Sequence, residues 1–148
     1  MNRYETLKDY FFVHIDEHCH GMYKQKALLH SIQVSALCQK LALEQHLDIE
    51  LAGIMGLFHD YIQFTHHSSF QHGPRCGEWI SSILNEFQDD EKMVIQQAIA
   101  RHSEKNKIDD VYSEILKDAD VLAQYFAEPD MIMSDTNQKR LKKYLPEI

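Results

Sequence analysis

Apolar residues recur at intervals of three and four along almost the whole chain, which is the spacing of one face of an α-helix. Alternation of apolar and polar residues, the pattern of a strand, never extends beyond a few positions. Glycine and proline, which interrupt helices, number only five and three among 148 residues. The sequence therefore predicts an all-α bundle of about six or seven helices. The predicted ranges are 4–18, 23–45, 49–60, 74–87, 90–103, 110–127 and 135–145.

Several of these ranges begin at residues that favour helix N-termini. They are Asp48, Pro74, Asp89, Asp109 or Asp110, and Ser134. The longest irregular stretch between helices is 63–73, which is polar and rich in histidine. A loop of this kind is a common place for groups that contact a substrate.

Size and composition restrict the class of protein. A chain of 148 residues with 44% hydrophobic and 26% charged residues is ordinary for a globular protein, and we expect one domain over residues 1–148. No run of eighteen apolar residues predicts a membrane span, and the first residues lack the pattern of a signal peptide. Three cysteines without a Cys-x-x-Cys pair indicate reduced thiols, so we expect a cytoplasmic protein.

The formal net charge is −8, and no run of lysine or arginine offsets it. Binding to duplex nucleic acid depends largely on neutralising phosphates with basic residues, so the sequence disfavours that function. A small nucleotide could still enter a locally charged cleft.

Four predicted helices carry a polar side chain in an otherwise apolar row. His30, for example, shares its row with Ala27 and Val34, and the apolar run "GIMGLFHD" ends in a histidine and an aspartate. The four positions are His30, His59, His102 and Asp120. A single histidine of this kind is usually a hydrogen-bonded core residue, whereas an unpaired buried carboxylate is costly. A divalent metal ion would satisfy all four together, since imidazole and carboxylate are suitable ligands for Zn, Mn or Fe.

The order of these residues resembles the H…HD…D motif of the HD superfamily of metal-dependent phosphohydrolases, which are all-α proteins. "HSIQVSALCQKLA" resembles the helix of the first histidine, "GIMGLFHD" that of the doublet, and "DADVLAQYF" that of the last aspartate. The resemblance covers about residues 25–127, which leaves 128–148 as a C-terminal helical extension. Asp118 competes with Asp120 for the last position, but its row looks less buried, and Asp120 fits the family phrase.

The resemblance implies a ligand set. His30, His59, Asp60 and Asp120 would be the primary metal ligands, and Asp60 would also be catalytic. In members with two extra histidines, the aspartate of the doublet bridges to a second metal. His72 and His102 fall where those histidines occur, which makes a dinuclear centre one of two alternatives. The metal could be Mn, Zn, Fe, Mg or Ni.

Two departures from the family pattern remove positive charge. Gln63 stands near the place of a lysine that often follows the doublet, and Gln33 stands where many members have arginine. Arg75, Arg101 and Lys105 are the remaining candidates for holding a phosphate. No general acid or base can be assigned from the sequence.

The resulting functional hypothesis is a phosphomonoesterase or phosphodiesterase that acts on a small phosphoester, with a nucleotide among the candidates. Metal-bound hydroxide would attack phosphorus. One alternative is a di-iron oxygenase, since a few HD-fold members have that activity. Another is a non-catalytic module that binds metal or a nucleotide. The basic, amphipathic segment 131–148 could pack on the bundle, cover the cleft or form a homodimer contact.

Overall fold

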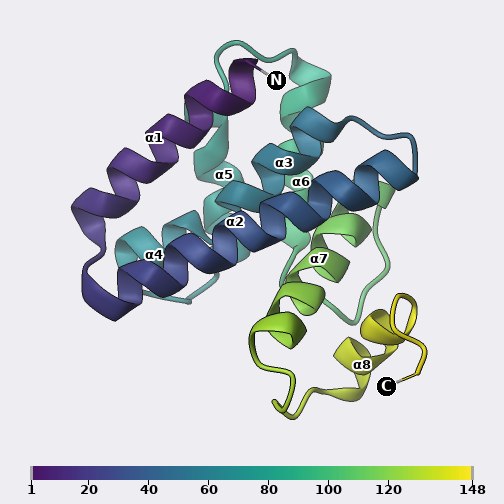
Figure 1. The fold of residues 1–148 in the computed structure, drawn as a ribbon. Coiled ribbons are helices and arrows are strands. Elements are labelled where there is room, and N and C mark those ends of the chain that lie inside the picture. The colour runs from purple at the N-terminus through teal and green to yellow at the C-terminus, as the bar shows by residue number, and fades with distance from the viewer. Residues whose placement is uncertain (1, 148) are drawn as a thin grey trace.

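The computed structural model describes residues 2–147, and all regular structure within them is helical (Figure 1). A short 3-10 helix, Ser81–Ile83, follows α5. The α-helices are α1 (Asn2–His18), α2 (Gly21–Glu44), α3 (Ile49–Phe58), α4 (Tyr61–His66), α5 (His72–Ile80), α6 (Asp89–Arg101), α7 (Val111–Ala127) and α8 (Asp135–Lys142). The predicted all-α fold is confirmed.

Each of the seven predicted ranges contains a helix, and the structure adds α4 inside a region that we expected to be mostly loop. Four of its six residues are buried, so this short helix is held by packing rather than by its own propensity. It ends at His67, which has a left-handed backbone conformation. The irregular stretch is therefore shorter than the predicted 63–73.

Helix starts agree with the sequence at three positions. The side chains of Asp48, Asp110 and Ser134 each accept a hydrogen bond from a backbone N–H in the first turn of the following helix. The prediction of Asp89 as the N-cap of α6 is wrong. Gln88 takes that place, because it forms a reciprocal capping box with Glu91.

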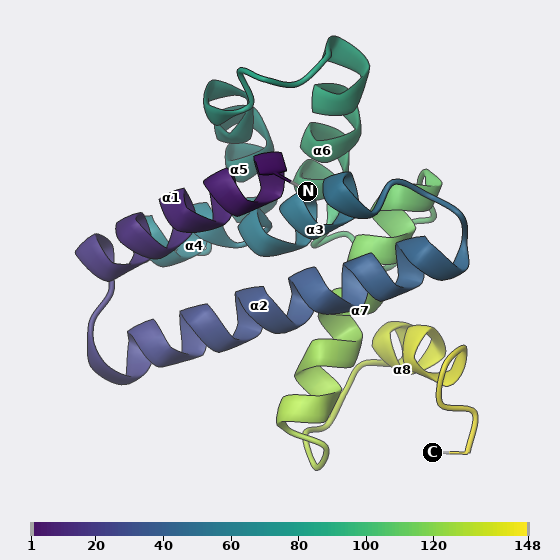
Figure 2. The same cartoon turned by 45° about the horizontal axis from the view of Figure 1, so that its top comes forward.

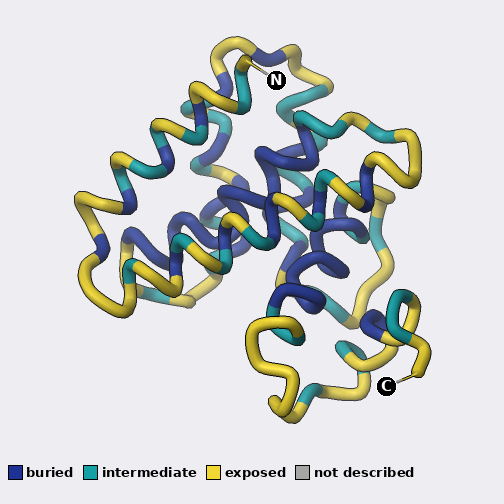
Figure 3. The backbone as a smooth tube through the Cα atoms, in the orientation of Figure 1, coloured by how far each residue is buried: buried dark blue, intermediate teal, exposed yellow. Residues whose placement is uncertain are grey.

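Two helices form the interior of the protein. Every residue of α3 from Leu51 to Phe58 is buried, and so is the middle of α7 (Figure 3). The long helix α2 crosses both of them, while α1, α5 and α6 lie on the other side of α3 (Figures 1 and 2). A helix that is apolar on all sides needs neighbours on all sides, and α3 therefore lies at the centre of the bundle. Among the described residues, no helix combines the length and apolar character that crossing a bilayer requires.

Two glycines allow helix pairs to approach unusually closely. A Cβ atom on Gly56 of α3 would lie 2.8 Å from the Cα atom of Ser35 in α2. A Cβ atom on Gly77 of α5 would lie 2.8 Å from the Cβ atom of Ala100 in α6. Real Cβ atoms do not approach that closely, so larger residues at either position would push the two helices apart.

The C-terminal segment packs on the bundle through a buried arginine. Arg140 of α8 donates to the carboxylates of Glu114 and Asp118 in α7 and to the carbonyl groups of Lys105 and Lys107. Of the three alternatives for this segment, the structure therefore shows packing on the bundle. The same contacts fix the turn between α6 and α7.

We predict that Gly56→Ala lowers the free energy of unfolding by about 2 kcal/mol, because the overpacking penalty exceeds the gain in helix propensity. Gly53→Ala is the matched control on the same helix. The atoms nearest to its added methyl group belong to the side chains of Gln39 and Tyr4, at 3.0 Å, and side chains shift more readily than backbone. Urea unfolding followed by circular dichroism measures both. Equal stabilities for the two variants would contradict the close-approach argument.

Candidate metal centre

Six histidine and aspartate side chains from five different parts of the chain meet between the helices. His30 lies in the middle of α2, and Asp120 lies in the middle of α7. The doublet occupies the break between α3 and α4, where the chain leaves one helix and enters the next. His72 opens α5, and His102 directly follows α6. The set is His30, His59, Asp60, His72, His102 and Asp120.

The first group contains His30, His59, Asp60 and Asp120, whose ligand atoms all lie within 4.8 Å of one another. The Nε2 atoms of His30 and His59 are 3.1 Å apart. The Oδ1 atom of Asp120 is 3.1 Å from the first of these nitrogens and 3.5 Å from the second. The four ligand atoms are therefore close enough together to bind a single ion.

The second group contains His72, His102 and the same aspartate, Asp60. Its Oδ1 atom is 3.2 Å from Nε2 of His72 and 3.0 Å from Nε2 of His102. Its Oδ2 atom faces the first group instead, at 3.4 Å from His30 and 3.2 Å from His59. One carboxylate thus presents one oxygen to each group, as a bridging ligand would.

The hydrogen bonds of the ring nitrogens show which atoms are free to bind a cation. The Nδ1 atoms of His59, His72 and His102 donate to the backbone carbonyl groups of Gly56, Ser69 and Ile99. Neutral imidazole then carries an unprotonated Nε2, which can only accept. The Nε2 atoms of His72 and His102 nevertheless face each other at 3.0 Å, beside a carboxylate oxygen. Three acceptors this close together repel one another unless a proton or a metal ion lies between them, and a metal ion would satisfy all three at once.

Asp120 provides a second indication that the cluster suits a cation. Its Oδ2 atom accepts a hydrogen bond from Nζ of Lys105 at 2.8 Å. Its Oδ1 atom is buried and has no hydrogen-bond partner among the described residues, although it faces the two histidines. A buried carboxylate oxygen without a partner is costly, and a metal ion in the first group would satisfy it. The donor set therefore fits divalent metal.

The electrostatics of the cluster also favour positive charge at its centre. Burial opposes protonation of His59, yet the carboxylates of Asp60 and Asp120 raise the pKa of its imidazole to about 10. Burial would raise the pKa of Asp120, but the Lys105 ammonium and the neighbouring histidines hold that pKa well below its usual range. The neighbouring histidines likewise hold the pKa of Asp60 well below its usual range despite burial, so both aspartates are ionised and available as ligands at neutral pH.

The row of Asp118 is less buried at Glu114 and Tyr125, as predicted, but Asp118 itself is buried. Asp118 is only 3% exposed, but its carboxylate faces α8, where it accepts hydrogen bonds from Arg140, Lys143 and the hydroxyl of Tyr144. Its charge is thus satisfied away from the cluster. Because residues two apart point in different directions on a helix, Asp120 alone faces the histidines.

The three cations considered as phosphate ligands lie in different surroundings. Lys105 reaches the cluster, but its ammonium group is bonded to Asp120 and to the carbonyl group of His102. Arg101 pairs with Asp110 on the surface. Arg75 lies beside His66 and donates to the carbonyl group of Phe70. The structure therefore brings only Lys105 into contact with the six-residue cluster.

The sequence analysis did not single out Gln124 and Glu128, which line a groove next to His30. A signal was present, since Gln124 lies four residues after Asp120 and so shares its face of the helix. The groove has a volume of about 480 Å³, in the range of small-ligand pockets. His30 is the residue that connects it to the metal cluster.

Comparison with known proteins agrees with this geometry. The family model described as "HD domain" matches residues 28–125, about two thirds of the chain and all six cluster residues. The chain belongs to the HD domain family. This superfamily comprises metal-dependent phosphohydrolases, and together with the cluster it indicates a site for divalent metal.

One curated relative is a ribonuclease Y from Lawsonia intracellularis (strain PHE/MN1-00), which is 29% identical over 101 residues. The match covers 68% of this chain but only 19% of the relative, so this HD-domain chain spans about a fifth of that protein's length. No solved structure matches the chain significantly.

We predict that the two groups can be emptied separately. His102→Ala should lower the bound metal from about two equivalents to about one, because only the second group loses a ligand. Asp60→Asn should release both ions, since this residue serves both groups. The measurement is inductively coupled plasma mass spectrometry on protein loaded with Mn, Zn or Fe(II). His66→Ala, which changes an exposed histidine outside the cluster, should retain the wild-type content. A full complement in Asp60→Asn would contradict the shared-ligand arrangement.

Proposed function

We propose that this protein is a metal-dependent phosphohydrolase that acts on a small phosphoester, with nucleotides as the leading substrate class. The observation that supports it best is the pair of ligand groups joined by Asp60, with one carboxylate oxygen directed at each group. A purely structural core has no need for such a costly concentration of charge. Two adjacent cations suit the transfer of a phosphoryl group, in which both the attacking and the leaving oxygen need stabilisation.

In this proposal His30, His59, Asp60 and Asp120 hold one ion, and Asp60, His72 and His102 hold the other. Bound metal would supply Lewis-acid stabilisation of the phosphoryl oxygens and a water of lowered pKa. The backbone carbonyl groups of Gly56, Ser69 and Ile99 keep the imidazole rings in the tautomer that leaves Nε2 free.

Access to the cluster is unequal among its members. The side chains of His30 and His72 are 22% and 18% exposed, whereas those of His59 and His102 are 0% and 1% exposed. A phosphate group would therefore approach from the side of His30 and His72. Lys26 lines the groove beside His30, and the metal ions would balance most of the phosphate charge. Arg75, Arg101 and Lys105 remain proposals for any further phosphate contact.

The choice of a small substrate rests on charge. The relative's name, ribonuclease Y, is consistent with phosphoester chemistry in this superfamily. The present chain has a net charge of −8, and a long polyanion would be repelled by it. A small phosphomonoester or cyclic diester avoids most of that repulsion.

A di-iron oxygenase is the second candidate. The six-ligand set with a bridging carboxylate, which supports two ions, is also suitable for a pair of iron ions. Oxygen-dependent turnover with Fe(II) alone would favour this candidate, and hydrolysis supported by Mn or Zn without oxygen would favour the first.

We predict that Mn-loaded protein hydrolyses 4-nitrophenyl phosphate or bis(4-nitrophenyl) phosphate, and that Asp60→Asn lowers kcat by more than about 100-fold, because neither ion keeps its full ligand set. Nitrophenolate absorbance measures the rate. The exposed-histidine variant His66→Ala serves as the matched control and should retain kcat. Metal-loaded wild type that hydrolyses neither ester, nor any of a panel of nucleotides, would refute the phosphohydrolase proposal.

A further inference from the structure

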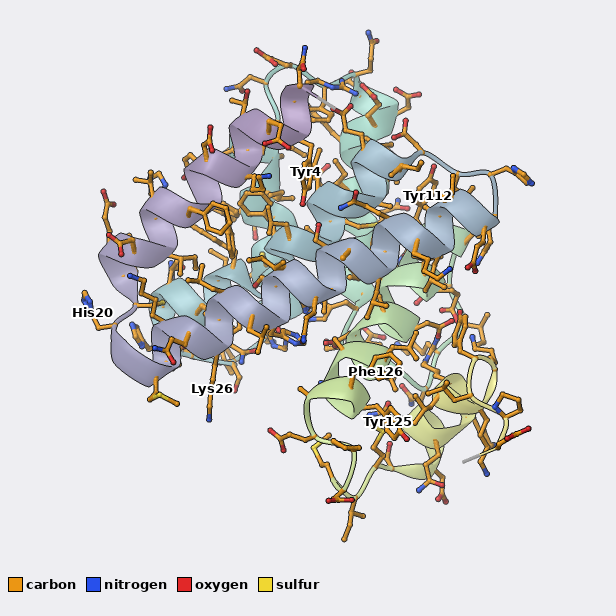
Figure 4. The ribbon with its side chains drawn as sticks, viewed as in Figure 1. Tyr4, His20, Lys26, Tyr112, Tyr125 and Phe126 are labelled. Carbon is orange, nitrogen blue, oxygen red and sulfur yellow. The ribbon has the colours of Figure 1, made fainter. Side chains whose placement is uncertain are left out.

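The groove beside the metal cluster has two facing walls. Lys26, His30 and Gln33 are spaced by four and three residues along α2, and they form one wall with Leu29. The other wall comes from the end of α7 and the segment after it. Figure 4 shows Lys26 extending from α2 on the side toward which the C-terminal part of α7 projects. The second wall consists of Gln124, Ala127, Glu128 and Met131.

Two glutamines stand one helical turn from two of the metal-ligand candidates. Gln33 follows His30 by three residues, and Gln124 follows Asp120 by four. One turn of helix advances about 5.4 Å, so each amide lies just outside the place where a bound phosphate would sit. Both side chains are partly buried, and neither has a hydrogen-bond partner among the described residues. An amide offers both a donor and an acceptor, which suits an uncharged polar group.

The remaining residues of the groove carry almost no net charge. Lys26 provides one positive charge, and Glu128 provides one negative charge. Leu29, Ala127 and Met131 are apolar, and the exposed Leu29 and Met131 side chains would be covered by a ligand in the groove. A second or third phosphate group would find one lysine there and would be opposed by Glu128.

We propose that this groove binds the leaving group of a phosphomonoester, and that it selects an uncharged leaving group with an apolar face and polar edges. A nucleoside has this chemistry, so the preferred substrate is a nucleoside monophosphate rather than a triphosphate. The inference rests on the proposed function, since the phosphate is taken to lie at the metal cluster. In the reaction, water oxygen bonds to phosphorus, the bond from phosphorus to the ester oxygen breaks, and that oxygen receives a proton to give the nucleoside and inorganic phosphate.

The test compares two substrates of Mn-loaded protein. The adenosine of adenosine 5′-monophosphate would occupy the groove, whereas 4-nitrophenyl phosphate has a smaller leaving group. The double variant Gln33→Met, Gln124→Met keeps the side-chain volume but removes the hydrogen bonds. In the double variant we expect kcat/KM for adenosine 5′-monophosphate, divided by kcat/KM for 4-nitrophenyl phosphate, to fall at least about 10-fold. The main cause should be a higher KM for the nucleotide. Gln25→Met is the matched control, because this exposed glutamine of α2 lies outside the groove and should leave the ratio unchanged.

A second variant tests the charge argument. Glu128→Lys should raise kcat/KM for ATP relative to adenosine 5′-monophosphate by about 5-fold or more, since a repulsive charge becomes attractive. An unchanged preference would show that Glu128 does not select against polyphosphates, and it would overturn that part of the proposal.

The possible outcomes distinguish a failure of the groove proposal from a failure of the phosphohydrolase proposal. Hydrolysis of both substrates with an unchanged ratio in the double variant would overturn the groove proposal and leave the phosphohydrolase intact. If metal-loaded protein hydrolyses nothing, binding of adenosine 5′-monophosphate measured by calorimetry tests the groove proposal. A Kd raised at least about 10-fold in the double variant supports the proposal. Equal binding by the two proteins, or no binding at all, overturns it.

Discussion

The shared carboxylate of Asp60 is the constraint on which the arrangement of this protein depends. It lies at the break between two helices, is almost fully buried, and faces histidines on both sides. Burying it costs free energy unless positive charge approaches both oxygens. Among the described residues, four imidazoles lie near it, but no lysine or arginine forms an ion pair with it. Protonated imidazoles or metal ions can supply this charge, and in our proposal metal ions do so, which would couple metal binding to the stability of the core.

Close helix packing then brings the ligands to this carboxylate. Gly56 lets α3 approach α2. His59 directly follows α3, and His30 lies in α2. Gly77 lets α5 approach α6, and that pair carries His72 and precedes His102. Each ligand group thus depends on one pair of helices. In each pair a glycine, which has no side chain, lets the two helices lie close together. Gly56 also orients the ring of His59, because its carbonyl group accepts a hydrogen bond from Nδ1 of that histidine.

The C-terminal helix contributes to the site without touching it. Arg140 of α8 holds the carbonyl groups of Lys105 and Lys107, and the fully buried Lys117 binds Asp109 at the other end of the same turn. These contacts fix the turn that presents the ammonium group of Lys105 to Asp120. One oxygen of Asp120 is occupied by this contact, so only the other remains for a metal. The sequence analysis had considered Lys105 only as a phosphate ligand, and the structure gives it a clear role in orienting Asp120.

Residue patterns alone predicted the helical fold, most of the helix starts and the resemblance to the family. Helical spacing and capping side chains are local, so they can be read without knowing which helices touch. The sequence also marked His30, His59, Asp60, His102 and Asp120, because polar side chains in apolar rows conflict with burial. The packing of the helices decided how His72 joins the cluster and which of the two aspartates of α7 faces it. His72 had no apolar row to mark it and joins the cluster through the packing of α5 on α6. Asp118 is as buried as Asp120, and the two differ only in what they face: Arg140 across one interface, and two histidines across the other.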